Sequence, residues 1–191
     1  MTAGADETVR LPATGARWGA RGRDADVFAA QVDELFRRCE RRVGKYLVQM
    51  VGDRGLAEDL LQDVFHDAFR AREQLKDVRN ADAWLFGIAR NRALNALRKG
   101  RRLQTALTRL ARRPVPSELD HELLALRDLL ERHVLPEDRS LLILRYLHGF
   151  DALELGEMTG RSAEAVRQRL ARARAKLMAA ATEPLDSRRE D

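Results

Sequence analysis

Apolar residues recur at helical spacing along most of the chain, and no stretch alternates between apolar and polar residues as a half-buried strand would. The pattern predicts an all-α fold. The expected helices cover residues 25–51, 56–73, 81–102 and 119–134, then a segment from Pro136 to just before Gly149, and finally residues 152–158 and 162–177.

The last two of these segments have the pattern of a helix-turn-helix motif. Asp151 followed by Glu154 resembles a capping box, Gly160 is suited to a left-handed helix end, and Ser162 stands where an N-cap belongs. At 100° per residue the final helix has one narrow apolar stripe with basic residues on both flanks. The stripe consists of Val166, Leu170, Ala173 and Leu177. A helix, a short glycine turn and a basic helix are typical of DNA binding.

The helix at 56–73 has an apolar face and an acidic face. Leu60, Leu61, Val64, Phe65 and Ala68 form the apolar face. On the other side Asp59, Asp63 and Asp67 follow one another at intervals of four residues, a spacing at which like charges oppose the helix. A solvated face is the usual explanation of such an acidic ridge, and a basic partner surface is the alternative.

The helix at 81–102 divides into a core stripe and a polar ridge. The stripe holds Leu85, Ile88, Ala89, Ala93 and Ala96, and the ridge holds Gly87, Arg90, Asn91, Leu94 and Arg98. Beyond it, Pro114 and Pro116 indicate a flexible linker at 103–117. We therefore expect two small helical modules, at 24–102 and 118–180, between a mobile segment at 1–23 and a polar tail at 181–191.

Charge is segregated along the 191 residues, although the net charge is only +5. Residues 79–113 contain ten Lys or Arg and one Asp, and residues 161–176 contain six Lys or Arg and one Glu. Residues 118–139, between them, contain seven acidic residues and three Arg. Two basic blocks on separate modules suggest two surfaces that face polyanions.

Composition also excludes several classes of protein. The single Cys39 rules out an internal disulfide framework and a CxxC metal site, and His66, His121, His133 and His148 lack metal-ligand spacing. We therefore expect neither a metal nor a cofactor. No apolar run is long enough for a membrane span, and we recognise no signal peptide, so we expect a soluble cytoplasmic protein.

Three functions compete at this point. The first is a DNA-binding protein that uses the basic surfaces of both modules. The second is an autonomous helix-turn-helix repressor or activator whose N-terminal module dimerises or senses a signal. The third is a metal-dependent nucleotide hydrolase built on the acidic ridge, for which Asp33, Glu34 and Glu40 are the only further ligands. These do not form the paired carboxylate clusters that such a site requires, so we do not expect an enzyme.

Three segments, in order, resemble the bacterial extracytoplasmic-function (group 4) sigma factors of the sigma-70 family. AEDLLQDVFHDAF at 57–69 is similar to region 2.2, AWLFGIARNRALN at 83–95 to regions 2.3 and 2.4, and residues 135–177 to region 4. The resemblance implies a promoter-specificity subunit that binds core RNA polymerase, recognises the minus-10 and minus-35 elements and helps to open the DNA. It also implies an anti-sigma factor as a partner.

The resemblance also implies three sets of site residues. Contacts with core polymerase would come from Asp59, Leu61, Gln62, Asp63 and Phe65. The minus-10 element would meet Asn80, Trp84, Arg90, Asn91 and Arg98, with the loop at 74–80 receiving an unpaired base. The minus-35 element would meet Ser162, Glu164, Ala165, Arg167, Gln168, Arg169, Arg172, Arg174 and Lys176.

The chemistry of these residues suits such roles. Glu164, Ala165, Gln168 and Arg172 lie opposite the apolar stripe, where base edges are read, and the flanking cations can neutralise phosphates. Trp84 beside Arg90 offers a stacking surface and a charge for single-stranded bases, although a core-anchoring role for Trp84 is as plausible.

The sequence also departs from the family pattern. Gly156 replaces the usual Ala, which would cost about 1 kcal/mol in a helix. Ala163 and Glu164 leave the minus-35 sequence open, and the loop LKDVRNAD leaves open which base it captures.

Overall fold

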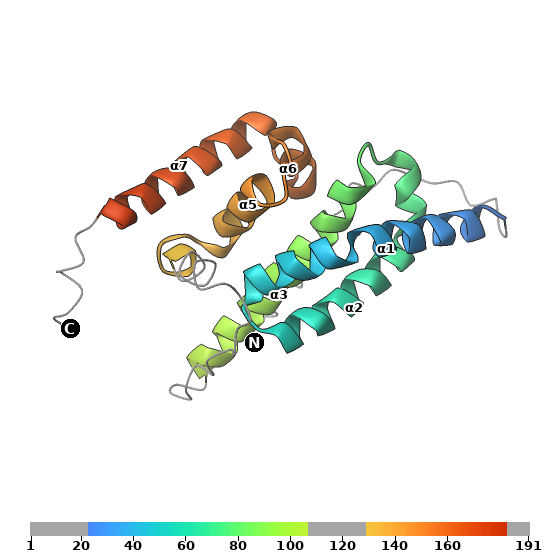
Figure 1. Ribbon diagram of the computed structural model, residues 1–191, viewed down its shortest axis with the longest axis horizontal. Helices are drawn as coiled ribbons and strands as arrows, with labels where there is room; N and C mark the ends of the chain where they lie inside the picture. The colour runs from blue at the N-terminus through green and yellow to red at the C-terminus, as the bar shows by residue number, and fades with distance from the viewer. Residues whose placement is uncertain (1–22, 107–128, 183–191) are drawn as a thin grey trace, which may run out of the picture.

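The structure is a computed structural model that describes the backbone of residues 23–106 and 129–182 and the side chains of residues 30–100 and 129–180. Its elements are α1 (Arg23–Val51), α2 (Arg54–Arg70), the 3-10 helix η1 (Arg72–Asp77), α3 (Ala81–Ala106), α5 (Pro136–Tyr146), α6 (Ala152–Thr159) and α7 (Ala163–Thr182). Residues 129–133 are also helical, and the described residues contain no strand (Figure 1). The expected all-α fold is confirmed. The segment at 1–22, linker residues 107–117, the helix at 119–128 and the tail at 183–191 lie outside the described residues.

The N-terminal module is a bundle of α1, α2 and α3, in which each helix packs on the other two. Its core includes Val43, Leu47, Val64, Leu85 and Ala89, all without exposed surface. Apolar periodicity places these residues on the faces of the three helices that point into the bundle. In a three-helix bundle each helix buries one such apolar stripe. Asp53 begins α2 as its N-cap, where the carboxylate accepts a 2.8 Å hydrogen bond from the Leu56 amide.

Two boundaries differ from the sequence expectation. Arg72–Asp77, expected to be the end of a helix and part of the following loop, forms the 3-10 helix η1. Short 3-10 helices often connect α-helices. Leu75 of η1 packs on the core. Helix α3 extends to Ala106, four residues into the expected linker. Residues 103–106 contain neither proline nor glycine, so no helix-breaking residue stops α3 where the core stripe ends.

The C-terminal module consists of α5, α6 and α7, and its caps are those that the sequence predicts. Pro136 occupies the first turn of α5, and Asp151 with Glu154 forms a complete capping box at the start of α6. Gly160 adopts a left-handed conformation at the end of α6, with φ of 63°. The Ser162 hydroxyl then accepts a 3.1 Å hydrogen bond from the Ala165 amide, which caps α7.

The two modules pack directly on each other. Helices α5 and α6 lie against α1 and α3, and α7 lies along the outer side of the α5–α6 pair (Figure 1). The buried side chains of both modules form one continuous cluster. The sequence gives no indication of this contact, since the long-range pairing of two helical modules leaves no local pattern.

Candidate nucleic-acid interface

Helix α7 presents the surface that the sequence assigns to base reading. Val166 and Ala173 are buried, as the apolar stripe predicts, while Glu164, Gln168 and Arg172 on the opposite side are exposed. The Glu164 carboxylate accepts hydrogen bonds from Arg167 at 3.3 Å and from Gln168 at 3.2 Å. This exposed crest therefore carries a carboxylate, an amide and a guanidinium side by side.

Arg169 differs from the other cations of α7. Its Nε and Nη2 atoms lie 2.7 Å and 2.5 Å from the same carboxylate oxygen of Asp138 on α5, and both side chains are largely buried. This ion pair joins α7 to α5, so the charge of Arg169 is already matched within the fold. The sequence pattern gives no sign of this pairing, because the two residues lie 31 positions apart. The exposed flank cations are Arg167, Arg174 and Lys176.

The turn before α7 explains the glycine at 156. A Cβ atom on Gly156 would lie 2.6 Å from the Arg161 carbonyl oxygen, closer than real Cβ atoms approach backbone. The Arg161 amide donates a 3.0 Å hydrogen bond back to the Gly156 carbonyl, which fixes the tight turn. The expectation that Gly156 is merely an unfavourable helix residue is therefore wrong, because the close approach of the turn requires it.

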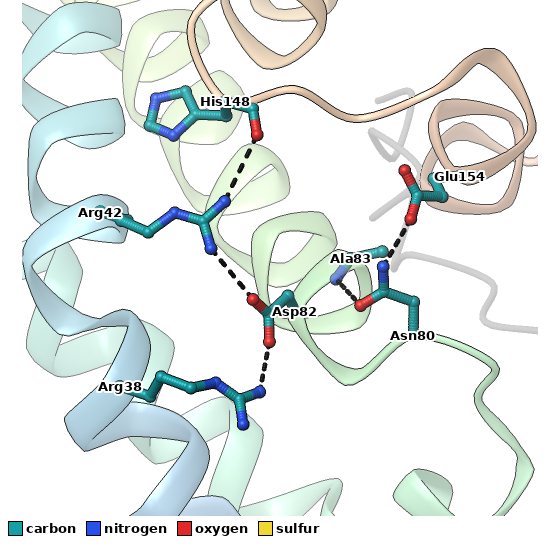
Figure 2. Close-up of polar contacts among 7 residues, drawn as sticks. All are labelled: Arg38, Arg42, Asn80, Asp82, Ala83, His148 and Glu154. Atoms are coloured by element: carbon teal, nitrogen blue, oxygen red, sulfur yellow. Dashed lines mark hydrogen bonds and ion pairs between the residues drawn. The ribbon is translucent and has the colours of Figure 1, made fainter.

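At the start of α3, Asn80 makes contacts in two directions. Its Oδ1 atom accepts a 3.2 Å hydrogen bond from the Ala83 amide, and its Nδ2 atom donates a 2.5 Å hydrogen bond to Glu154 of α6. Figure 2 shows the Asn80 side chain between these two partners. Asn80, a candidate for the minus-10 site, thus caps α3, and its side-chain amide is already hydrogen-bonded to the C-terminal module.

Asp82 lies close to Asn80 in the sequence and forms ion pairs with two arginines of α1. Arg38 contacts one carboxylate oxygen at 2.5 Å and Arg42 contacts the other at 3.0 Å (Figure 2). Partial burial alone would raise the pKa of Asp82, but the hydrogen bond and charge of Arg38 lower it. Arg42 also donates a 3.3 Å hydrogen bond to the His148 carbonyl, so this cluster extends to the second module.

Trp84 and Arg90 occupy different environments. Trp84 is partly buried against the core, and its indole N–H donates a 3.4 Å hydrogen bond to Gln74. Arg90 has a buried Nε atom that makes no hydrogen bond within the described residues. Burial lowers the pKa of Arg90. The nearby Tyr46 and Glu137 side chains raise this pKa, whereas the charges of Arg169 and Arg161 lower it further.

The rest of the α3 ridge is only partly open to solvent. Asn91 is half-buried and Arg98 is exposed, whereas Leu94 is 3% exposed. A Cβ atom on Gly87 would lie 3.7 Å from Cγ and 3.9 Å from Cβ of Met158. The expectation of one polar ridge opposite the core is therefore wrong for Gly87 and Leu94. The C-terminal module packs on α3 as well, so α3 is apolar on more than one side.

An arginine of the same module partly neutralises the acidic ridge of α2. Arg92 of α3 binds both carboxylate oxygens of Asp67 at 2.6 Å and one oxygen of Asp63 at 3.3 Å. Sequence reasoning did not identify Arg92, because its distance along the chain from its partners gives no periodic signal. Asp59 and Gln62 are exposed on the same helix.

The apolar members of the polymerase set pack on α1. Phe65 packs against Phe36 with ring centroids 4.6 Å apart and the rings tilted by 59°, and Cδ2 of Leu61 lies 3.7 Å from the position of a Cβ atom on Gly44. Both side chains are partly buried. They therefore shape the α2 surface, and its charge comes from the acidic residues.

Within the described ranges, no group of three or more His, Cys, Asp or Glu side chains is placed to hold a metal ion. The described helices also include none that is long and apolar enough to cross a bilayer.

Comparison with known proteins assigns both modules. Residues 35–103 match the family described as Sigma-70 region 2, and residues 123–177 match Sigma-70, region 4. The RNA polymerase sigma factor CarQ of Myxococcus xanthus is 33% identical over 151 residues, which cover 76% of this chain and 86% of CarQ. The ECF RNA polymerase sigma factor SigM of Bacillus subtilis (strain 168) is 35% identical over 68 residues, which cover 36% of this chain and 41% of SigM.

Two solved structures have a similar fold. One is the sigma factor RpoE in complex with the anti-sigma factor NepR from Bartonella quintana, with a TM-score of 0.63 and 23% identity over 80% of this chain and 98% of that chain. The other is CnrH in complex with the cytosolic domain of CnrY, with a TM-score of 0.60 and 26% identity over 82% of this chain and 96% of that chain. The matched regions, the relatives and the helical fold agree, and the chain belongs to the extracytoplasmic-function sigma factors of the sigma-70 family, which direct RNA polymerase to promoters.

Proposed function

We propose that this sigma factor divides promoter recognition between two helices, with α7 reading the minus-35 duplex and α3 receiving the minus-10 strand. The minus-35 set is Ser162, Glu164, Ala165, Arg167, Gln168, Arg172, Arg174 and Lys176, and the minus-10 set is Asn80, Trp84, Arg90, Asn91 and Arg98. Arg169 belongs to the minus-35 surface as a positioning residue, because Asp138 holds its guanidinium.

The exposed crest of α7 is the observation that carries this proposal. The N-terminal turns of a recognition helix face the base edges, and here they present Glu164 and Gln168, followed by Arg172 in the third turn, above a buried stripe. A carboxylate can accept from cytosine, an amide can pair with adenine, and a guanidinium can pair with guanine. The flank cations Arg167, Arg174 and Lys176 then position the helix on the phosphates, which adds affinity without sequence preference.

The minus-10 role of α3 rests on the chemistry of Trp84 and Arg90. Base stacking on an aromatic ring contributes roughly 1–3 kcal/mol per base, and Trp84 lies near the start of α3, partly buried against the core. Arg90, further along α3, supplies a positive charge. Because captured bases are removed from the duplex, this binding favours strand separation without nucleotide hydrolysis. The chain then acts as a binding subunit, not as an enzyme.

The α2 surface is proposed to dock core polymerase. Asp59, Gln62 and Asp63 are exposed there, and Leu61 and Phe65 hold the surface in shape against α1. An acidic face suits a basic surface of the polymerase. The proposed site of action is therefore the cytoplasm, where the polymerase works.

An anti-sigma factor is the proposed regulator. One of the similar solved structures is a sigma factor in complex with an anti-sigma factor, and the other is CnrH in complex with the cytosolic domain of CnrY. An inhibitor of this chain would have to obstruct α2, α3 or α7, since these helices and the residues that cap them carry all three proposed sites.

Reconstituted transcription tests the proposed function. Core polymerase with this protein should start RNA at defined positions on genomic DNA fragments, and core polymerase alone should not. If the protein binds DNA without polymerase but never directs initiation, an autonomous repressor or activator is the better description.

A further inference from the structure

An acidic residue lies inside the basic surface that α7 presents to DNA. An open hollow of about 340 Å³ lies between α7, the turn before it and the first turn of α5. Of the described side chains that line this hollow, Asp138 alone is acidic. The charged and polar lining residues are Asp138, Arg161, Gln168, Arg169, Arg172 and Lys176. A carboxylate on a surface that faces phosphates lowers the general affinity for DNA, so the contribution of Asp138 lies elsewhere.

Asp138 and Arg169 form a partly buried ion pair in the hollow. The Nε and Nη2 atoms of Arg169 lie 2.7 Å and 2.5 Å from Oδ1 of Asp138. The two side chains are 19% and 22% exposed for Asp138 and Arg169, whereas Arg172 and Lys176 are fully on the surface. Two donors on one acceptor fix the direction of the planar guanidinium group. The pair therefore ties one flank of α7 to the first turn of α5.

The apolar stripe alone constrains the rotation of α7 only weakly. Val166, Leu170 and Ala173 are buried and cover a narrow arc of the helix, which lies alongside α5 and α6 (Figure 1). Such a stripe opposes removal of the helix more strongly than rotation about its own axis. Arg169 comes three residues after Val166 and so lies about 60° around the helix from it. A second anchor at this angle fixes the rotation of α7.

The reading of bases depends on that rotation. Gln168 and Arg172 are exposed next to Arg169 on the crest of α7. An atom ~6 Å from the helix axis moves by about 1 Å when the helix rotates by about 10°. Hydrogen bonds to base edges weaken steeply with such a displacement, whereas the attraction between a cation and a phosphate varies slowly with distance. Rotation of α7 therefore affects sequence preference more than general affinity.

We propose that Asp138 is a positioning residue for minus-35 recognition, which holds α7 through Arg169 at the rotation that base reading requires. Asp138 itself makes no contact with DNA. Its charge lowers the affinity for every sequence, and its hydrogen bonds raise the preference for the correct one. The inference rests on the minus-35 assignment proposed above and extends it to a residue of α5.

Two substitutions of Asp138 separate its geometry from its charge. Asp138→Ala and Asp138→Asn remove the same charge, but asparagine keeps an oxygen atom that can accept both donors of Arg169. Arg169→Lys is the complementary change, because it keeps the charge and loses the planar pair of donors. Each full-length variant is assembled with core polymerase. Competition binding then compares a DNA fragment on which the wild-type holoenzyme starts RNA with the same fragment scrambled around position minus-35.

The ratio of the two affinities measures sequence preference and cancels any effect on assembly with polymerase. Asp138→Ala and Arg169→Lys should lower this ratio by about tenfold, the loss of roughly one base contact. Asp138→Asn should stay within about threefold of the wild type. The affinity of Asp138→Ala for the scrambled fragment should equal that of the wild type or exceed it, because a negative charge leaves the DNA-facing surface. Glu137→Gln removes a charge from the same turn of α5 and should leave the ratio unchanged.

An unchanged ratio in Asp138→Ala would overturn the proposal. Equal losses in Asp138→Ala and Asp138→Asn would do so as well, since charge would then be the cause. If both fragments bind more weakly by the same factor, the pair only supports the fold. Urea unfolding shows whether each variant is folded at the assay temperature, and Arg169→Lys carries the test if Asp138→Ala is not. A wild-type holoenzyme that starts RNA equally well and binds equally tightly on both fragments would refute the minus-35 assignment itself, whereas normal discrimination by the wild type and all variants refutes only the role of Asp138.

Discussion

The Arg161 carbonyl oxygen lies 2.6 Å from the position that a Cβ atom would take on Gly156, so the turn between α6 and α7 closes directly over a glycine. Gly156→Ala should lower the free energy of unfolding by about 1–3 kcal/mol, because the added methyl group has to displace backbone. Urea unfolding followed by circular dichroism measures the change.

Gly100→Ala is the matched control for this substitution. Gly100 lies in α3, and no atom of the part of the chain that the structure describes lies within 4 Å of its Cβ position, so alanine should stabilise the helix by up to about 1 kcal/mol. If both variants are stabilised, the close approach at Gly156 does not constrain the turn.

His148 should make the contact between the modules sensitive to acid. Burial, together with the charges of Arg42 and Lys45, lowers the pKa of His148 from 6.5 to about 4. The ring packs against Tyr46 and Phe86, and its Nε2 atom lies 3.2 Å from the Gln49 side-chain oxygen. The nearby carboxylate of Asp82 is already bound by Arg38 and Arg42, so a protonated ring would lack a free counterion within this cluster.

The sign of the pH effect follows from the lowered pKa. Above about pH 6.5 His148 is neutral both in the contact and when released, and the contact keeps its full stability. As the pH falls from about 6.5 towards 4, only the released ring takes up a proton. The contact is then weakened by roughly 2 kcal/mol, a figure reduced to allow for screening of the partly exposed ring by solvent. Nuclear magnetic resonance titration of the ring and urea unfolding at several pH values measure both quantities.

The controls for this prediction are two further variants. His148→Phe keeps an aromatic ring but cannot titrate, so it should abolish the pH dependence of stability between about pH 6.5 and 4. His66→Gln, at an exposed position, should leave it intact. A titration of His148 near pH 6.5 in the wild-type protein would contradict the prediction.

Asp59→Arg should weaken binding to core polymerase by on the order of tenfold, or ~1.4 kcal/mol, if α2 docks on a basic surface. Asp63 is a less selective choice, because an arginine in its place would also face Arg92 and replace the present ion pair with a repulsion. The effect of Asp59→Arg should shrink as salt is added, since exposed charges are screened. Fluorescence anisotropy with labelled protein measures the affinity at each salt concentration.

Glu58→Arg controls for the charge change alone. Glu58 is the neighbouring residue on α2 and points in a different direction around the helix, and its exposed ion pair with Arg54 contributes little to stability. Equal weakening by the two variants would mean that general charge, and not the Asp59 face, sets the affinity.

Arg172→Ala should relax sequence preference on the minus-35 duplex, and Arg174→Ala should mainly weaken binding to all sequences. Without the Arg172 guanidinium, discrimination at one base pair should fall by about 1–3 kcal/mol. Without the Arg174 charge on a phosphate, the slope of log affinity against log salt should fall by about 1. Titrations against single-substituted duplexes at several salt concentrations separate the two effects, and indistinguishable variants would remove the division between crest and flank.

Local pattern accounts for most of the secondary structure and for the crest of α7. Periodicity placed Val64, Leu85 and Ala89 in the core, and capping residues such as Asp151 and Ser162 marked helix starts, because these signals depend on neighbours a few residues away. The resemblance to sigma factors rested on the same short segments.

The local sequence pattern did not predict contacts between residues that are far apart along the chain. Arg92 pairs with Asp67 across 25 residues, Arg169 with Asp138 across 31, and Tyr46 with Ser140 across 94. Each of these residues satisfies the same local pattern with or without its partner. For that reason the sequence pattern indicated an unpaired ridge at Asp67 and a free phosphate ligand at Arg169.

The hydrogen bond from Arg139 to the Met50 carbonyl has a consequence for the end of α1. A helix ends with carbonyl groups that lack an intrahelical donor and carry the negative end of the helix dipole, and a cation from another module here provides the cap. When the modules separate, the last turn of α1 loses this cap and frays. Faster amide hydrogen exchange in that turn, against an unchanged rate in the middle of the helix, would therefore report separation of the modules in solution.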